Sequence, residues 1–414
     1  MSILRYLARS LAFLPPILLL AGALGVVSCG KGLYSATSSS SGSASPTSTS
    51  TATNGGYAFV TNRNSGYISE FKRNITTGIL KYNTRIAAGA TGSGGGPLGI
   101  AITQNNQFLY ACNSQDGNIY QYTVASDGTL TPMTPPSVPN GPKTAPIQVL
   151  TLSTSSGTPQ WLFVTNSGNG TVSAYPIQPA GPLGSAVTAT GFRAPFGMAI
   201  NSTGTVLYVS DNAAGLIYSL GFNSKTGALS NLSPLSPINS QGSYGGNPAG
   251  LALSPVFTTV SGTGALLLAG DSNPNTTLLS LFFAPSTGTG ALTGFTPGTP
   301  ASQAAIGTAW VGTSIALSAN NGTGALGTGS ITSYTVSGNT LLTVNTVNPV
   351  NGPVSIVVDP QTQFAYSTNI QDGTISQYPV SSTLCTTGGI CPSVNDIKSD
   401  TASNPGPYGI VLSN

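Results

Sequence analysis

The chain has no histidine and only one glutamate, Glu70, among its 414 residues. Lys, Arg, Asp and Glu together make up 5% of it, and no run of basic residues occurs. Without histidine or a group of neighbouring cysteines a typical zinc site is excluded, whereas a calcium site built from Asp and carbonyl oxygens is not. The lack of a basic patch argues against a nucleic-acid partner. We therefore expect no metal and no other cofactor.

Long helical patterns are also missing. Segments of four to eight residues rich in β-branched and aromatic residues alternate with Gly, Asn and Pro, which predicts an all-β fold. The 53 glycines and 30 prolines together stay below the ~25–30% typical of a disordered chain. The apolar content is sufficient for a large core.

What the chain does contain is a degenerate two-strand phrase that occurs seven times. Its period is about 51 residues, which in strands is typical of the blades of a β-propeller. The first strands are YAFVTN (57–62), FLYACN (108–113), WLFVTN (161–166), VLYVSDN (206–212), ALLLAGDSN (265–273), TAWVGTS (308–314) and FAYSTN (364–369). The second strands are GYISEF (66–71), GNIYQY (117–122), GTVSAY (170–175), GLIYSL (215–220), TTLLSLFF (276–283), GSITSYTV (329–336) and GTISQY (373–378).

Two further strands complete the repeat. The strand before each phrase begins with Pro, where a missing N–H costs least, and is expected to be the innermost one. It reads PLGIAI (97–102), PIQVLTL (146–152), PFGMAI (195–200), PAGLAL (248–253), PVSIVV (353–358) and PYGIVL (407–412), and no clear copy precedes 308–314. The outermost strand follows turns such as TGIL (77–80), DGTL (127–130) and TGAL (226–229 and 289–292).

The two ends of the repeat array complement each other. The strand at 57–62 has no inner strand before it, and the inner strand 407–412 has no partner after it. The sequence therefore predicts a seven-bladed β-propeller over residues 57–414, whose ring is closed by the C-terminal strand in the N-terminal blade. Closure removes edges that would otherwise promote aggregation.

The N-terminal region predicts export. Residues 1–28 have the pattern of a signal peptide, with Arg5 and Arg9 before an apolar stretch. The stretch ends in Val-Val-Ser-Cys29, which resembles the lipobox of bacterial lipoproteins; the alternative is an ordinary signal peptide with a chance cysteine. The resemblance implies that Cys29 carries the lipid, and residues 29–56, mostly Ser, Thr, Gly and Ala, would form a flexible tether. We expect a bacterial cell-envelope protein, lipid-anchored at the outer membrane.

The other cysteines suggest different roles. Cys385 and Cys391 bracket a five-residue loop and are expected to form a disulfide in an oxidising envelope. Cys112 lies within a repeat strand and is expected to be a buried free thiol.

The repeats resemble those of the seven-bladed lactonase family, which includes 6-phosphogluconolactonase-like and carboxymuconate-cyclising proteins. The resemblance covers residues 57–412 and rests on motifs that are structural. It implies a ligand face formed by the loops at one end of the ring. The enzymes of the family use His, Arg and Glu near the channel mouth, and this chain lacks the first of these altogether. We therefore assign no catalytic residue.

Candidate ligand residues are nevertheless present at that end. Asp116, Asp211, Asp271 and Asp372 lie at or beside turns of the repeat. They are either oxygen ligands of a cation or, as we favour, Asx residues that bond their own turn backbone. Arg193 precedes an inner strand, and Tyr244 and Asn247 precede the next. These three are our candidate ligand-binding residues, with solvated or packing roles as the alternative.

The sequence thus favours a lactonase-like propeller that binds an envelope partner, either a protein or a neutral glycan, and that contacts the membrane only through its lipid. We expect a monomer. Two alternatives stay open, a lactonase-type hydrolase acting on a sugar or carboxylic acid lactone, and a purely structural surface protein. Whether the chain is an enzyme is not decided at this level.

Overall fold

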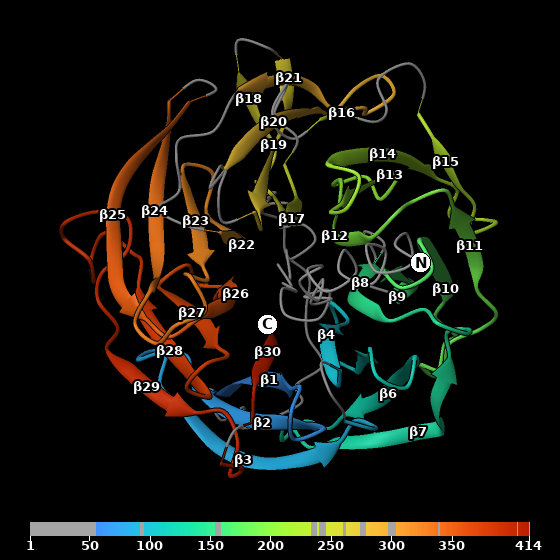
Figure 1. Ribbon diagram of the computed structural model, residues 1–414, viewed down its shortest axis with the longest axis horizontal. Coiled ribbons are helices and arrows are strands. Elements are labelled where there is room, and N and C mark those ends of the chain that lie inside the picture. Colours follow the sequence, from blue (N-terminus) through green and yellow to red (C-terminus); the bar gives the residue numbers. More distant parts are fainter. Residues whose placement is uncertain are drawn as a thin grey trace, which may run out of the picture.

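The chain folds into a ring of β-sheets. The computed structural model describes residues 55–91, 95–153, 159–232, 238–239, 246–259, 262–273, 279–296, 304–337, 340–403 and 405–413. Within this part all the named secondary-structure elements are β-strands, and they form seven sheets. Figure 1 shows the sheets as blades around one axis. The seven-bladed β-propeller predicted from the repeats is confirmed.

The first four blades contain these strands, each blade given from its inner to its outer strand. Blade 1 has β30 (Pro407–Leu412), β1 (Gly55–Asn62), β2 (Tyr67–Asn74) and β3 (Leu80–Ala87). Blade 2 has β4 (Pro97–Ile102), β5 (Phe108–Asn113), β6 (Asn118–Val124) and β7 (Leu130–Pro139). Blade 3 has β8 (Pro146–Ser153), β9 (Pro159–Asn166), β10 (Thr171–Pro176) and β11 (Val187–Thr190). Blade 4 has β12 (Pro195–Ile200), β13 (Val206–Asp211), β14 (Leu216–Phe222) and β15 (Leu229–Asn231), and β16 (Ile238–Asn239) also pairs with β14.

The remaining three blades follow the same order. Blade 5 has β17 (Pro248–Leu253), β19 (Gly262–Asp271), β20 (Ser280–Pro285) and β21 (Thr293–Thr296), and β18 (Phe257–Thr259) also pairs with β19. Blade 6 has β22 (Ala305–Val311), β23 (Ile315–Asn320), β24 (Gly329–Ser337) and β25 (Thr340–Val350). Blade 7 has β26 (Pro353–Val358), β27 (Phe364–Asn369), β28 (Thr374–Pro379) and β29 (Asn395–Lys398).

The ring closes as the sequence predicted. Strand β30 pairs antiparallel with β1, with Ala58 opposite Leu412 and Val60 opposite Ile410. The last strand of the chain is therefore the inner strand of blade 1, which also contains the first described strand, β1. This pairing gives β1 a partner on both sides.

The prediction for blade 6 was wrong in one strand. TAWVGTS (308–314) was expected to be the second strand, but residues 305–311 form the inner strand β22, and the second strand is β23. Asn320, at the end of β23, donates to Ser330 Oγ and Thr332 Oγ1 at 3.0 Å each, as Asn166 and Asn369 at the ends of β9 and β27 do to hydroxyls of their third strands. The inner copy was missed because it does not start with Pro.

The repeated YVTN phrase stabilises contacts between blades. Its Thr hydroxyl donates to the carbonyl of the second residue of the next blade's inner strand. Thr61 Oγ1 lies 2.5 Å from the Leu98 oxygen, and Thr165 Oγ1 lies 2.8 Å from the Phe196 oxygen. Thr368 Oγ1 makes the same bond to the Tyr408 oxygen at 2.7 Å, across the closure of the ring. The motif is thus structural.

Glycines at the inner strands allow these strands to approach one another. A Cβ built on Gly197 would lie 2.2 Å from the backbone oxygen of Ala249 in the next blade. No real Cβ makes so short a contact, so a side chain here would push the inner strands apart.

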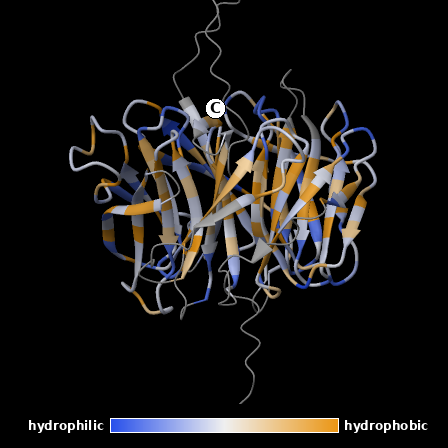
Figure 2. Cartoon of the chain, turned by 90° about the horizontal axis from the view of Figure 1, so that it is seen from above, coloured by the Kyte–Doolittle hydropathy of each residue, from blue (hydrophilic) through white to orange (hydrophobic). Residues whose placement is uncertain are grey.

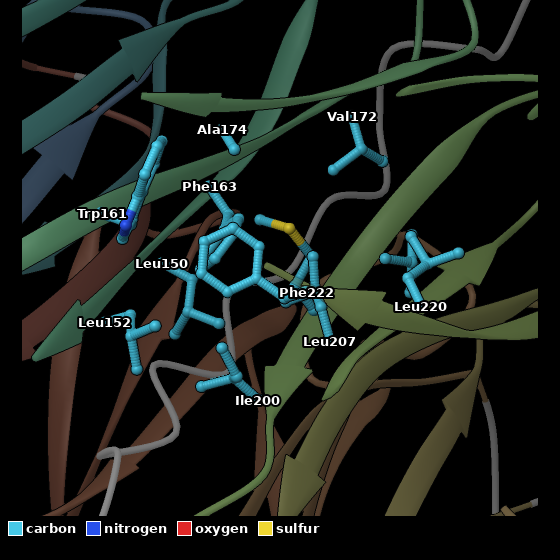
Figure 3. Close-up of a cluster of buried hydrophobic side chains, with 12 residues drawn as sticks. Leu150, Leu152, Trp161, Phe163, Val172, Ala174, Ile200, Leu207, Leu220 and Phe222 are labelled. Atoms are coloured by element: carbon cyan, nitrogen blue, oxygen red, sulfur yellow. The ribbon is translucent and has the colours of Figure 1, made fainter. Parts of the chain in front are cut away.

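The core lies between successive blades. Figure 3 shows the cluster between blades 3 and 4, where Trp161 and Phe163 pack against Phe222 with ring centroids 5.4 and 4.8 Å apart. Both pairs are edge-to-face, a favoured arrangement for aromatic rings. Seen edge-on in Figure 2, the hydrophobic residues follow the strands between two faces lined by loops. One of these faces carries the candidate site.

Candidate functional site

The turns between the second and third strands share one face with the loops that lead into the inner strands. Asn64 N donates to the Pro405 oxygen at 3.0 Å, and Asn212 N donates to the Ala194 oxygen at 3.0 Å. Gly168 N donates to the Thr144 oxygen at 2.9 Å. This face, which we call the entry face because the inner strands start there, is the one on which the sequence placed the candidate residues.

Apolar side chains close the axis at the entry face. Each inner strand places its second residue in one of two clusters that share Ile147. The seven residues are Leu98, Ile147, Phe196, Ala249, Ile306, Val354 and Tyr408. All are buried except Ile147, which is half-buried. Because a polar reaction centre needs donors and acceptors that converge on one point, this apolar ring, formed by the second residues of the inner strands, is a poor setting for lactone chemistry.

The carboxylates at the turns are occupied by backbone donors. Asp211 Oδ2 accepts from Arg193 N at 2.7 Å, and its Oδ1 accepts from Ala194 N at 2.9 Å. Asp271 Oδ1 accepts from Asn247 N at 3.0 Å and from Asn273 N at 2.8 Å. Both carboxylates therefore hold the loop that enters an inner strand, through backbone 17–24 residues away in sequence. The bonds to their own turn, which the sequence favoured, are those from Ala214 N to Asp211 Oδ1 at 3.2 Å and from Asn273 N to Asp271 Oδ1.

The other two turn carboxylates act in the same way. Asp116 accepts from Ala90 N at 3.1 Å, from Asn118 N at 3.0 Å and from the Tyr120 hydroxyl at 2.9 Å. Asp372 accepts from Thr374 N at 3.0 Å and from Asn351 Nδ2 at 2.7 Å. No group of three or more potential metal ligands occurs among the residues with described positions.

The predicted ligand residues are only partly brought together. Arg193 is exposed, and its guanidinium has no hydrogen bond or ion pair to a described residue. Asn247 is half-buried and donates from Nδ2 to the Asn212 oxygen at 3.0 Å, while Asn212 Nδ2 donates back to the Asn247 oxygen at 3.2 Å. Asn247 thus links blades 4 and 5. Tyr244 lies outside the described residues, as does Cys29.

Sequence reasoning missed the arginine nearest the axis. Arg63 follows the YVTN phrase of blade 1, and its backbone N–H donates to the Gly406 oxygen at 2.8 Å. Its side chain is half-buried and lies close enough to Tyr408 to act electrostatically on that phenol. Its Nε is buried without a hydrogen-bond partner in the described structure. The signal was its place directly after Asn62, where most other copies have Ser or Asn.

A shallow groove lies between blades 2 and 3. Its volume is about 630 Å³, and its lining from β7, β10 and the segment before β11 contains no charged residue. Tyr175 and Asn140 line it and bond each other, the hydroxyl donating to Oδ1 at 2.7 Å. Such a surface suits an uncharged ligand and offers no acid or base for catalysis.

The cysteines have structural surroundings. Cys385 and Cys391 form a disulfide. The loop that it closes lies against blade 6, because Ile390 N donates to Ser333 Oγ at 3.2 Å and Asn345 Nδ2 donates to the Ile390 oxygen at 2.7 Å. Cys112 is a free and buried thiol, and burial raises its pKa to about 12. A thiol with so high a pKa is no nucleophile at neutral pH.

Glu70 is a buried carboxyl whose pKa lies near neutrality. It lies in β2, and its Oε1 accepts from Leu130 N of blade 2 at 3.4 Å, while its Oε2 has no hydrogen-bond partner in the described structure. Burial, only partly offset by that hydrogen bond, raises its pKa from 4.5 to about 7. Gln121, four residues after the repeat glycine as Glu70 is, accepts the equivalent bond from Leu183 N of blade 3 at 3.0 Å. Glu70 therefore acts as a contact between blades.

We expect Glu70→Gln to make the protein more stable above pH 7. The folded state holds the proton more tightly than the unfolded state, so the contribution of Glu70 is favourable below about pH 4.5 and is lost as the pH rises through about 7. Urea unfolding should show a gain of about 1–3 kcal/mol at pH 8 and little change at pH 4. The reverse substitution Gln121→Glu is the matched control and should introduce the same pH dependence. Equal curves for Glu70→Gln and the wild type at pH 8 would contradict this assignment.

No helix able to span a membrane was found in the described part of the chain. This result leaves the predicted lipid anchor untested, because the Cys29 segment lies outside that part.

The comparisons with known proteins agree with the fold. Residues 86–194 match the family model of the Lactonase, 7-bladed beta-propeller. No curated protein sequence matches the chain. A proposed 6-phosphogluconolactonase from Bacteroides uniformis superposes with a TM-score of 0.67 at 16% identity, over 87% of this chain and 99% of the other.

Two further structures are similar. A proposed 6-phosphogluconolactonase from Bacteroides fragilis has a TM-score of 0.64 at 16% identity, over 89% of this chain and 100% of its own. A functionally unknown protein from Desulfotomaculum acetoxidans has a TM-score of 0.58 at 12% identity, over 86% and 99%. The chain is therefore a lactonase-like seven-bladed β-propeller, with the sequence pattern of that family matched over residues 86–194 and the fold shared around the ring.

Proposed function

We propose that the propeller is a binding module for an uncharged ligand or an envelope protein, and that it does not hydrolyse lactones. The observation that carries this proposal is that the carboxylates of the entry face accept hydrogen bonds from the backbone. Asp116, Asp211, Asp271 and Asp372 each accept backbone N–H groups. These carboxylates hold the turns and loops of the entry face, and this structural role supports a binding scaffold rather than a catalytic base.

The chemistry of the chain supports the same view. A lactone hydrolase needs a base to activate water and a donor or cation for the developing oxyanion. The chain has no histidine, its one glutamate lies between blades rather than at the axis, and apolar residues close the axis at the entry face. The groove between blades 2 and 3, lined by uncharged residues, is one hollow in which a neutral ligand such as a glycan would fit.

The alternative function is a lactonase-type hydrolase. It is favoured by the match to the lactonase family model and by the names of the structural neighbours. In that case Arg63 and Arg193 are two entry-face cations that could hold a lactone or its phosphate, and Arg63 lies near Tyr408 of the inner strand β30.

An activity assay separates the two functions. We expect gluconolactone and 6-phosphogluconolactone to open at the uncatalysed rate in the presence of the protein, because a placed acid or base, which contributes ~10²–10⁴-fold, is missing. Hydrolysis well above background that is abolished by Arg63→Ala or Arg193→Ala would establish the hydrolase instead. The matched control is Lys225→Ala, which removes an exposed cation remote from the inner strands.

The membrane anchor is part of the same proposal. The lipobox-like sequence at Cys29 supports lipid attachment and an outer-membrane location. The Cys29→Ser protein should move from the membrane fraction to the soluble envelope fraction. Identical fractionation of the two proteins would exclude the anchor and leave the binding function unaffected.

A further inference from the structure

The groove between blades 2 and 3 lies where blade 3 has a small side chain and both neighbouring blades have a large one. Ser173 follows the repeat glycine Gly170 by three residues, and the same position is occupied by Tyr120 in blade 2 and by Tyr218 in blade 4. Tyr120 packs against the core between blades 1 and 2, and Tyr218 packs edge-to-face on Phe192 with ring centroids 4.9 Å apart. The serine fills much less space, and it lines the groove instead.

The floor of the groove is a chain of neutral hydrogen bonds between buried side chains. Tyr175 and Asn140 are 3% and 9% exposed, and the Tyr175 hydroxyl donates to Asn140 Oδ1 at 2.7 Å. Asn140 Nδ2 in turn donates to Asn166 Oδ1, and Asn166 Nδ2 donates to Ser173 Oγ at 3.0 Å. Because the Ser173 oxygen accepts this bond, its O–H remains free to donate, either to Thr188 Oγ1 at 3.4 Å or to a ligand. The chain of bonds thus ends on hydroxyl groups in the groove.

The lining selects the chemistry of the occupant. None of the described residues that line the groove is charged, so an ionic ligand would lose hydration without gaining a counter-charge. Hydroxyl groups both donate and accept, and those of Ser173, Tyr175 and Thr188 therefore match the hydroxyls of a sugar. Val138 and Leu183 add apolar surface against which the C–H groups of a sugar ring can pack. The volume of about 630 Å³ lies within the ~300–1,000 Å³ of small-molecule sites.

An extended peptide is the other neutral occupant to compare, and the two wall strands disfavour it. Strands β7 and β11 are the outermost strands of their blades (Figure 1). A peptide that adds to a sheet needs main-chain donors along the strand edge, but Pro135, Pro136 and Pro139 of β7 have no N–H group. Strand β11 is only four residues long. Both edges are therefore poor templates for an added strand.

We propose that this groove binds a short neutral oligosaccharide, which lies between β7 and β11 above Ser173 and Tyr175. The proposal rests on the binding function proposed above and names the ligand class of one of its hollows. The buried hydrogen-bond chain holds the Ser173 and Tyr175 hydroxyls in place before the ligand arrives, which lowers the entropic cost of binding.

Titration of the protein with cellotriose, maltotriose and chitotriose, followed by calorimetry and by saturation-transfer NMR, tests the proposal. We expect at least one of these probes to bind at a single site. Ser173→Tyr should abolish this binding, because it gives blade 3 the residue that occupies the same position in blades 2 and 4. Thr188→Tyr narrows the groove from its exposed wall and should weaken binding ~10-fold or more by a steric clash.

Thr131→Tyr is the matched control, since Thr131 is exposed on β7 and lies outside the lining of the groove. It should leave binding unchanged, and thermal unfolding should show which variants are folded. If Ser173→Tyr does not fold, Thr188→Tyr decides, because Thr188 is exposed.

Failure to bind any of the probes would overturn the proposal, and so would binding that tolerates the tyrosine at position 188. A neutral Gly/Ser/Pro peptide that binds where the oligosaccharides do not, and that is blocked by Thr188→Tyr, would overturn it in favour of a polypeptide ligand. These outcomes differ from a failure of the proposed function, which would appear as lactone hydrolysis that depends on Arg63 or Arg193 and is unaffected by Thr188→Tyr.

Discussion

Removal of residues 407–414 is expected to abolish the soluble monomer. The deletion takes away β30, the inner strand of blade 1, whose Tyr408, Ile410 and Leu412 are at most 5% exposed. Burial of each such side chain contributes ~1.5–3 kcal/mol, so the loss approaches the ~5–15 kcal/mol that stabilises a typical protein. It also leaves β1 with an open edge towards the axis, which favours aggregation. Size-exclusion chromatography and dye binding to exposed apolar surface would measure the outcome.

A peptide provides the control for this deletion. Residues 405–413 supplied as a separate peptide during refolding should restore part of the soluble monomer, because β30 pairs with β1 non-covalently and does not need its covalent link to blade 7 for this pairing. A truncated chain that elutes as a monomer with the thermal midpoint of the full chain would show that β30 does not close the ring in solution.

Arg73→Met is expected to destabilise the closure strongly while leaving the entry face intact. Arg73 lies in β2, is 1% exposed, and its guanidinium lies 3.5 Å from Asp359 Oδ2 and 3.4 Å from the Ser413 oxygen. It also donates to Gln361 Oε1 at 3.3 Å. One side chain thus joins the third strand of blade 1, a turn of blade 7 and the residue that follows β30. Because removal of one partner leaves Asp359 buried without its counter-charge, the free energy of unfolding should fall by about 3–5 kcal/mol.

The second arginine–carboxylate pair of the described structure serves as the control. Arg85 lies 2.7 Å from Asp400 Oδ1, but its side chain is 33% exposed. Arg85→Met should cost less than Arg73→Met, because water solvates the partly exposed Arg85 and the buried Asp400 keeps hydrogen bonds from Ser65 Oγ and Thr401 N. Equilibrium urea unfolding measures both variants, and the double change Arg73→Met with Asp359→Asn should recover part of the loss. An Arg73→Met protein no less stable than Arg85→Met would refute the role given to Arg73.

The comparison of blades 6 and 1 shows where sequence patterns succeed. The closure by residues 407–412 follows from the order of the strand motifs. An inner-strand motif without a following second strand stands at the C-terminus, and the first second-strand motif at the N-terminus has no inner strand before it. In blade 6 the same reasoning failed, since β22 lacks the initial proline of the other inner strands. All four strands of a blade share a period of two, so alternation alone does not distinguish an inner strand from a second one.

At the entry face, too, the sequence predicted some features and missed others. The location of this face and the bonds of its aspartates to their own turns were predictable, because an Asx residue bonds to backbone close to it in sequence. Their bonds to the loops that enter the inner strands were not, since Asp211 and Arg193 N, for example, are 18 residues apart. The role of Asn247 was not, since its partner Asn212 lies 35 residues away in another blade. Nor was the importance of Arg63, which depends on its place beside Tyr408 at the far end of the chain.

The sequence by itself determined the class of fold, the number of blades, the order of their strands in six of them and the closure of the ring. These features are repeated in local patterns of strand, turn and spacing. Only the tertiary structure decided which residues meet between blades. Arg73 and Asp359 are 286 residues apart, and the apolar ring takes one residue from every blade. Contacts of this kind depend on how the blades assemble in three dimensions, and no single repeat contains them.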